Sequence, residues 1–86
     1  MKLFKSVDEK LEALGFKKIE ESEDIVVYEK ERPEYVHVLE LNRWGSGKTL
    51  IQSYQQGVNS DGFYNNVGLT VYEAHLASQK MYKKGW

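Results

Sequence analysis

Apolar residues recur at helical spacing near the start of the chain. Val7, Leu11 and Leu14 fall on one stripe of a helix, at positions i, i+4 and i+7. Ser6 stands just before this stripe with a glutamate three residues later, which is the capping-box pattern of a helix N-terminus. Gly15 follows the stripe and can adopt the left-handed conformation that ends a helix. We therefore expect a helix that begins at about Val7 and ends before Gly15.

A second stripe of the same period lies near the other end of the chain. Thr70 and the glutamate three residues later form another capping box. Lysines gather toward the end of the stripe, where the helix dipole favours cations, and Gly85 follows them. The pattern predicts a helix between Thr70 and Gly85, with the apolar positions Val71, Ala74, Ala77 or Ser78, and Met81.

Between these stripes the composition changes to that of strands. β-Branched and aromatic residues dominate segments 25–30, 35–41 and 49–54, and a weaker strand candidate covers residues 16–21. Pro33 and the glycines after Trp44 indicate turns, while residues 57–68 have the glycine- and asparagine-rich composition of a loop. The predicted fold class is α+β: a helix, an antiparallel meander of about four strands, and a C-terminal helix.

The composition favours one small domain that spans residues 1–86. A chain of 86 residues has room for a single core. The absence of cysteine excludes disulfides and thiolate zinc sites. Charges appear within the first few positions and no run of about 20 apolar residues follows, so we expect a cytoplasmic protein without a membrane segment.

The charges are divided unevenly along the chain. Residues 1–43 carry eight lysines and arginines against eleven aspartates and glutamates, whereas residues 44–86 carry four against two. Tight binding to a phosphate backbone needs clustered cations. Nucleic acid is therefore not the partner that this balance favours.

Two segments resemble ligand-binding motifs without completing them. Residues 45–49 copy the end of a phosphate-binding P-loop, but Asn42 stands where its first glycine is needed and a strand follows instead of a helix. Residues 57–68 match part of a calcium-binding loop but lack carboxylates at its first and last positions. His37 shares a strand face with Leu39 and Leu41, which indicates a half-buried structural histidine. We expect no cofactor, no metal site and no catalytic residue.

Both faces of the central strands carry apolar residues, although a sheet with one face in water normally alternates apolar with polar. Either the helices, or the loop with Phe63, cover the second face, or a second copy or protein partner does. Trp44 at a hairpin tip either packs on the fold or builds an aromatic platform with nearby tyrosines. The candidate interaction surface consists of Trp44, Tyr54, Tyr64, Val26, Tyr28, Val36 and Val38.

The sequence Leu-Gly-Phe-Lys-Lys-Ile-Glu-Glu at residues 14–21 is followed by Ile-Val-Val-Tyr-Glu-Lys at residues 25–30 and closed by Leu69-Thr70, Glu73, Met81 and Gly85-Trp86. In this pattern the chain resembles small proteins of Gram-positive bacteria and of their phages and prophages, a group without an assigned activity. The resemblance implies an accessory role in a mobile element or its host. It does not extend to residues 44–67.

These observations favour a non-enzymatic interaction module that binds a protein partner or forms a homodimer through the second sheet face. The first alternative is a weak binder of single-stranded nucleic acid that uses Trp44 and Tyr54. Its cations would be Arg43, Lys48, Lys80, Lys83 and Lys84. The second alternative is a small enzyme in which His37 and a neighbouring carboxylate share a pocket.

Overall fold

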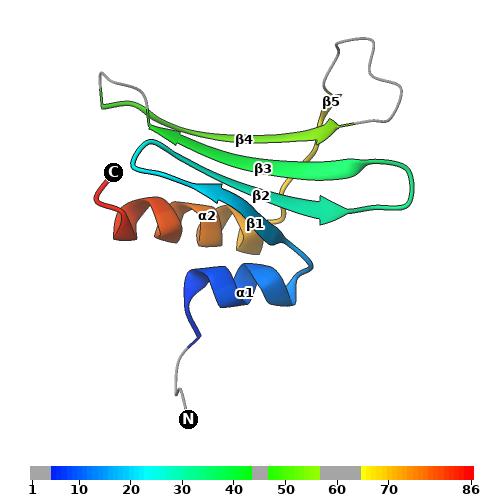
Figure 1. Ribbon diagram of the computed structural model, residues 1–86, viewed down its shortest axis with the longest axis horizontal. Coiled ribbons are helices and arrows are strands. Elements are labelled where there is room, and N and C mark those ends of the chain that lie inside the picture. The colour runs from blue at the N-terminus through cyan, green and yellow to red at the C-terminus, as the bar shows by residue number, and fades with distance from the viewer. Residues whose placement is uncertain (1–4, 44–46, 57–64) are drawn as a thin grey trace.

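The computed structural model describes residues 5–43, 47–56 and 65–86. A short helix opens the chain, five strands follow, and a longer helix closes it (Figure 1). The elements are α1 (Val7–Ala13), β1 (Lys17–Glu21), β2 (Ile25–Glu31), β3 (Val36–Arg43), β4 (Thr49–Gln56), β5 (Asn65–Asn66) and α2 (Val71–Lys83). The α+β class and the helix–meander–helix order predicted from the sequence are confirmed.

All five strands form one antiparallel sheet in the order β1-β2-β3-β4-β5, so that strands adjacent in sequence are adjacent in space. The sheet has one strand more than the sequence indicates. β5 contains two residues and lies inside the segment that the sequence assigns to a loop. Two asparagines carry no strand signal, because their pairing with Tyr54 and Gln55 comes from tertiary contact rather than from propensity.

Both capping boxes form as predicted. The Ser6 hydroxyl accepts the backbone N–H of Glu9 at 3.1 Å, and the Thr70 hydroxyl accepts that of Glu73 at 3.0 Å. Both helices also end in the same way. After α1 the N–H of Phe16 donates to the carbonyl of Leu11 at 3.0 Å, and after α2 the N–H of Trp86 donates to that of Met81 at 3.1 Å. These are Schellman motifs, in which Gly15 and Gly85 adopt φ of +99° and +81°.

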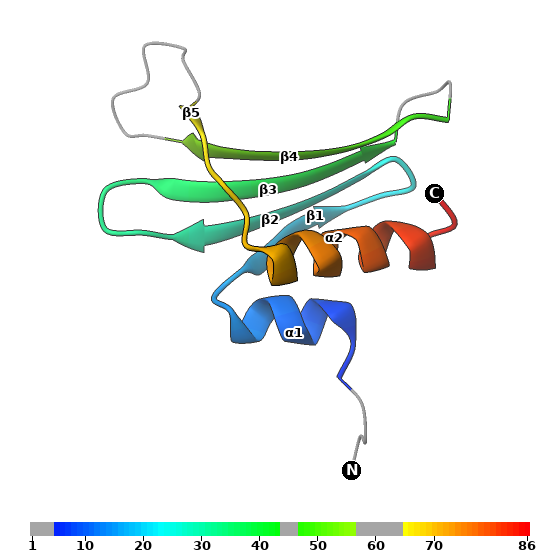
Figure 2. The same cartoon turned by 180° about the vertical axis from the view of Figure 1, so that it is seen from behind.

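The two helices cover one face of the sheet and leave the other open. Figure 2 shows α2 and the segment that leads into it in front of the sheet, with α1 beside α2. On the covered face Val26 lies opposite Leu41, and Tyr28 lies opposite Leu39. These side chains pack with apolar residues of the helices and of the α1–β1 turn to form the core, which consists of Val7, Leu11, Phe16, Val26, Tyr28, Leu39, Leu41, Leu76 and Ala77.

The helix layer is narrower than the sheet. In both cartoon views α1 and α2 lie along the β1–β2 side, whereas β4 lies beyond them (Figures 1 and 2). Consistent with this arrangement, the first four residues of β4 are all exposed. No helix within residues 5–43, 47–56 and 65–86 has the length and apolar character needed to cross a membrane.

Candidate functional site

The structure separates the residues that the sequence groups into one interaction surface. Val26 and Tyr28 are 0% and 1% exposed and belong to the core beneath the helices, so their placement on a free surface is wrong. The reason is the strand register, which turns them to the same side as Leu39 and Leu41. Trp44 and Tyr64 lie outside the described residues.

Val36, Val38 and Tyr54 do lie on the side that the helices leave open, but Val38 is 2% exposed, so its neighbours cover it and its placement on a free surface is also wrong. We call this side the open face; its apolar members are Ile25, Val27, Val36, Val38, Leu50 and Tyr54, placed by strand alternation and register. Side-chain hydrogen bonds hold the polar part of this face together. Glu40 accepts from Asn42 at 2.6 Å and from the Tyr54 hydroxyl at 3.4 Å. Neither helix covers this face.

The open face is acidic as well as apolar. Glutamates are cross-strand neighbours of its valines: Val27 lies between Glu20 and Glu40, and Val38 lies beside Glu29. The strands place on this face the glutamates Glu20, Glu29, Glu31 and Glu40, and a single cation, Lys17. A ligand that matches this face therefore presents basic and apolar groups together.

The two edges of the sheet differ in how they are protected. The β1 edge is short, four of its five residues are charged, and a bulge lies between Lys18 and Glu20. Charge and bulges both hinder pairing with another strand. β4 has eight residues and no charged side chain. β5 pairs with only Tyr54 and Gln55, so within the described residues the first half of β4 has no strand on its outer side.

A hollow of about 660 Å³ borders this outer side of β4. Its lining includes Ile51, Gln52 and Ser53 of the strand, and Val67 and Leu69 of the segment that leads to α2. Ile51 and Leu50, which point to opposite sides of the sheet, are 36% and 40% exposed. Apolar side chains therefore flank an exposed row of backbone groups.

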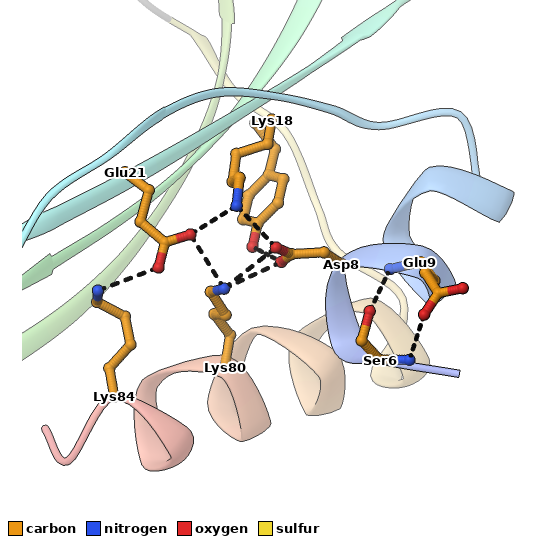
Figure 3. Close-up of polar contacts among 8 residues, drawn as sticks. Ser6, Asp8, Glu9, Lys18, Glu21, Lys80 and Lys84 are labelled. Carbon is orange, nitrogen blue, oxygen red and sulfur yellow. Dashed lines mark hydrogen bonds and ion pairs between the residues drawn. The ribbon is translucent and has the colours of Figure 1, made fainter. Parts of the chain in front are cut away.

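An ion-pair network joins α1, β1 and α2 on the helix side (Figure 3). Lys18 lies 2.9 Å from Asp8 and 2.7 Å from Glu21, and Lys80 lies 3.2 and 3.1 Å from the same two carboxylates. Burial raises the pKa of Asp8, but hydrogen bonds from Tyr28, Lys18 and Lys80 outweigh it and lower that pKa to about 2. The hydrogen bond from Lys18 likewise lowers the pKa of Glu21 to about 2. This network connects the elements of the fold.

The network engages two of the cations that the nucleic-acid hypothesis needs. Lys80 pairs with both carboxylates, and Lys84 lies 3.2 Å from Glu21. The Tyr54 ring lies on the acidic open face, on the opposite side of the sheet from these lysines. The structure therefore does not bring these cations and this aromatic ring to one surface.

His37 lies on the strand side that the pattern predicts, but it is buried rather than half-buried, at 5% exposed. Its ring meets that of Phe16 edge-on at 5.2 Å, and its Nε2 lies 2.6 Å from the Ser53 hydroxyl. Sequence reasoning misses this contact with Ser53, because the two residues lie on different strands and only the β3–β4 register brings them together. Burial lowers the pKa of His37, so its neutral form is favoured.

His37 shares a small hollow with a carboxylate, which is the arrangement that the enzyme alternative names. Glu73 is the nearby acid that lines the same small hollow, of about 260 Å³, but its Oε1 accepts the Thr70 N–H at 2.8 Å as part of the helix cap. In the described part of the chain no group of three or more histidine, aspartate or glutamate side chains could hold a metal ion. His37 and Ser53 share one hydrogen bond inside the fold.

Comparison of the chain with protein-family models, with curated proteins and with solved structures finds no match.

Proposed function

We propose that this protein is a non-enzymatic interaction module that binds a protein partner through the open face of its sheet. The observation that carries the proposal is the composition of that face, where apolar side chains such as Val27 and Val36 alternate with glutamates. Both helices pack on the other side, so neither of them covers the open face (Figure 2). Exposed apolar area rimmed by polar groups is typical of protein–protein interaction sites.

The charge of the open face defines the chemistry of the partner. Four glutamates against one lysine attract a surface with lysine or arginine side chains and repel phosphates. A basic protein surface with apolar side chains among its cations is complementary to this pattern. Single-stranded nucleic acid, the alternative, supplies bases for stacking but brings its negative charge to an acidic face.

The biological setting belongs to the same proposal. The resemblance of the two chain ends to small proteins of Gram-positive bacteria and their phages favours an accessory role in a bacterial host or its prophage, and we place that role in the cytoplasm. A binding role agrees with a site made of surface complementarity rather than of reacting groups.

A titration of the ¹⁵N-labelled protein tests the proposal. The probes are a peptide of alternating lysine and leucine, its glutamate–leucine counterpart, and a single-stranded oligothymidylate. We expect the basic peptide alone to shift amide signals, and to shift them in β2, β3 and β4. Shifts caused by the oligonucleotide and not by the basic peptide would favour the nucleic-acid alternative and overturn the proposal.

Charge reversal on the open face provides the matched variant. Glu20→Lys combined with Glu31→Lys changes two exposed carboxylates of this face, and we expect binding of the basic peptide to weaken about tenfold or more. Glu12→Lys combined with Glu23→Lys makes the same change in net charge at exposed positions outside the open face. Equal weakening by both double variants would show attraction by net charge rather than a site.

A further inference from the structure

The outer edge of β4 has hydrogen-bonding groups turned away from the sheet. The carbonyl of Ser53 accepts the N–H of Val67 at 3.0 Å, so the backbone of Ser53 faces away from β3. Backbone groups in an antiparallel strand alternate from residue to residue between the two sides. Thr49 and Ile51 therefore also direct their N–H and C=O groups outward, where the described residues provide no backbone partner.

We propose that this edge pairs with the β4 edge of a second copy of the chain, antiparallel and about a two-fold axis at Leu50. In this register Thr49 of each copy lies opposite Ile51 of the other. The N–H of each residue donates a hydrogen bond to the C=O of the residue opposite. The four resulting hydrogen bonds use groups that have no backbone partner among the described residues, and they leave the Ser53–Val67 bond in place. An axis at Ile51 would instead require the Ser53 carbonyl, which is already occupied.

The side chains of this register are compatible with one another. Leu50 meets Leu50 of the second copy as a non-hydrogen-bonded pair, the closer of the two pair types, on the open face. Ile51 meets Thr49 of the second copy on the helix side. Leu50 and Ile51 are exposed in the single chain, and pairing buries apolar area on both sides of the sheet.

Charge favours a second copy of the chain as the partner of the β4 edge. β4 has no charged side chain, so two β4 strands approach one another without repulsion. The acidic open face cannot pair with itself in this way, because four glutamates would meet four glutamates. The β1 edge has its bulge and its mixed charges. The neutral β4 edge is thus the part of the described sheet suited to self-association, and the inference does not depend on the partner proposed for the open face.

The contact predicted is small. Three consecutive positions on each side provide four hydrogen bonds, one leucine–leucine pair and two isoleucine–threonine pairs, which bury well below the roughly 1,200 Å² of a stable interface. The dimer should therefore form at high concentration and dissociate on dilution.

Sedimentation velocity from low micromolar to near-millimolar concentration tests the inference, with hydrogen exchange as the local readout. We expect a reversible monomer–dimer equilibrium, and protection of the Thr49 and Ile51 amides that grows with concentration. The Leu50 amide, which faces β3, should be protected at every concentration. A chain that remains monomeric throughout, with Thr49 and Ile51 unprotected, overturns the inference.

Ile51→Pro removes an outward N–H and leaves the bonds to β3 untouched. Each copy contributes one Ile51 N–H, so the substitution removes two of the four hydrogen bonds of the dimer. We expect the dissociation constant of the dimer to increase roughly thirtyfold. Ile51→Val keeps the backbone group, and Ile19→Lys alters the β1 edge instead; neither should change the equilibrium. A dimer that tolerates Ile51→Pro uses another surface and contradicts the register. If this variant does not fold, the exchange measurement on the unmodified chain still decides.

Discussion

The hydroxyl of Tyr28 donates a 2.6 Å hydrogen bond to the carboxylate of Asp8, and this bond ties the first turn of α1 to the central part of the sheet. Tyr28 is 1% exposed, so its ring is part of the core while its oxygen reaches the ion-pair network at the border of the core. Burial, together with the Asp8 charge, raises the pKa of Tyr28 well above its usual range. The raised pKa favours the protonated phenol, which is the form that donates this hydrogen bond.

Tyr28→Phe should destabilise the fold without changing its core packing. The substitution removes one donor to a charged acceptor, and we expect the free energy of unfolding to fall by about 1.5–3 kcal/mol. Urea denaturation at neutral pH measures the change. Tyr82→Phe removes a hydroxyl from a tyrosine that is 83% exposed and should have no measurable effect. A loss of equal size in both variants would mean that the bond to Asp8 does not contribute.

The carboxylates of the network should make the fold sensitive to acid. Asp8 and Glu21 both have a folded-state pKa of about 2, below the unfolded values near 4. Their contribution to stability is therefore fully present above about pH 5 and is lost as the pH falls toward 2.

Asp8→Asn and Glu21→Gln should each reduce the dependence of the free energy of unfolding on pH. Because both side chains are partly exposed, we expect each carboxylate to account for about 1–2 kcal/mol of the loss, after allowance for solvent screening. Urea denaturation between pH 7 and pH 2 measures the slope. Glu12→Gln, at an exposed position outside the network, is the control. An unchanged slope in both network variants would contradict the assignment.

His37 should add a second, milder pH dependence. Its folded pKa lies below 6.5 because the ring is buried, so the unfolded state binds the proton more readily. Stability is then complete above about pH 7 and declines as the pH falls below 6.5. NMR titration of the His37 ring signals checks the direction. His37→Asn should remove the decline between pH 7 and pH 5, and a ring that titrates above 6.5 would refute the prediction.

Gly15→Ala should destabilise the end of α1. Gly15 has φ of +99°, a conformation that residues with a Cβ adopt with strain, and an added Cβ would lie 3.4 Å from the Lys30 side chain. We expect a loss of about 1–2 kcal/mol in thermal or urea unfolding. Gly68→Ala is the matched control, because no atom lies within 4 Å of its added Cβ and its φ is not in the left-handed region. Equal losses would show that the left-handed conformation is not the cause.

Features that depend on neighbours in sequence were predictable. The Ser6 and Thr70 caps, the helix ends at Gly15 and Gly85, and the strands of the meander follow from residues a few positions apart. His37 was also placed correctly, because strand alternation puts it on the side of Leu39 and Leu41.

The interaction surface was predicted only in part. Val36 and Val38 are on the open face, but Val26 and Tyr28 are in the core. Alternation shows that Val26 and Val27 point to opposite sides of a strand, yet it does not show which of them shares a side with Leu41. A shift of one residue in the pairing of β2 with β3 would turn the inward-facing residues of β2 outward and the outward-facing ones inward. Likewise, nothing near Asp8 in the sequence reveals its contact with Lys80, which lies 72 residues away.

The sequence alone therefore determined the two helices, the four longer strands and their order, because capping, helix ends and strand alternation are interactions between near neighbours. Tertiary structure decided the rest: the register that turns Val26 inward and Val27 outward, the open face, and the exposed outer edge of β4. These properties depend on how segments distant in the chain align, and that alignment is set by packing the helices against one side of the sheet.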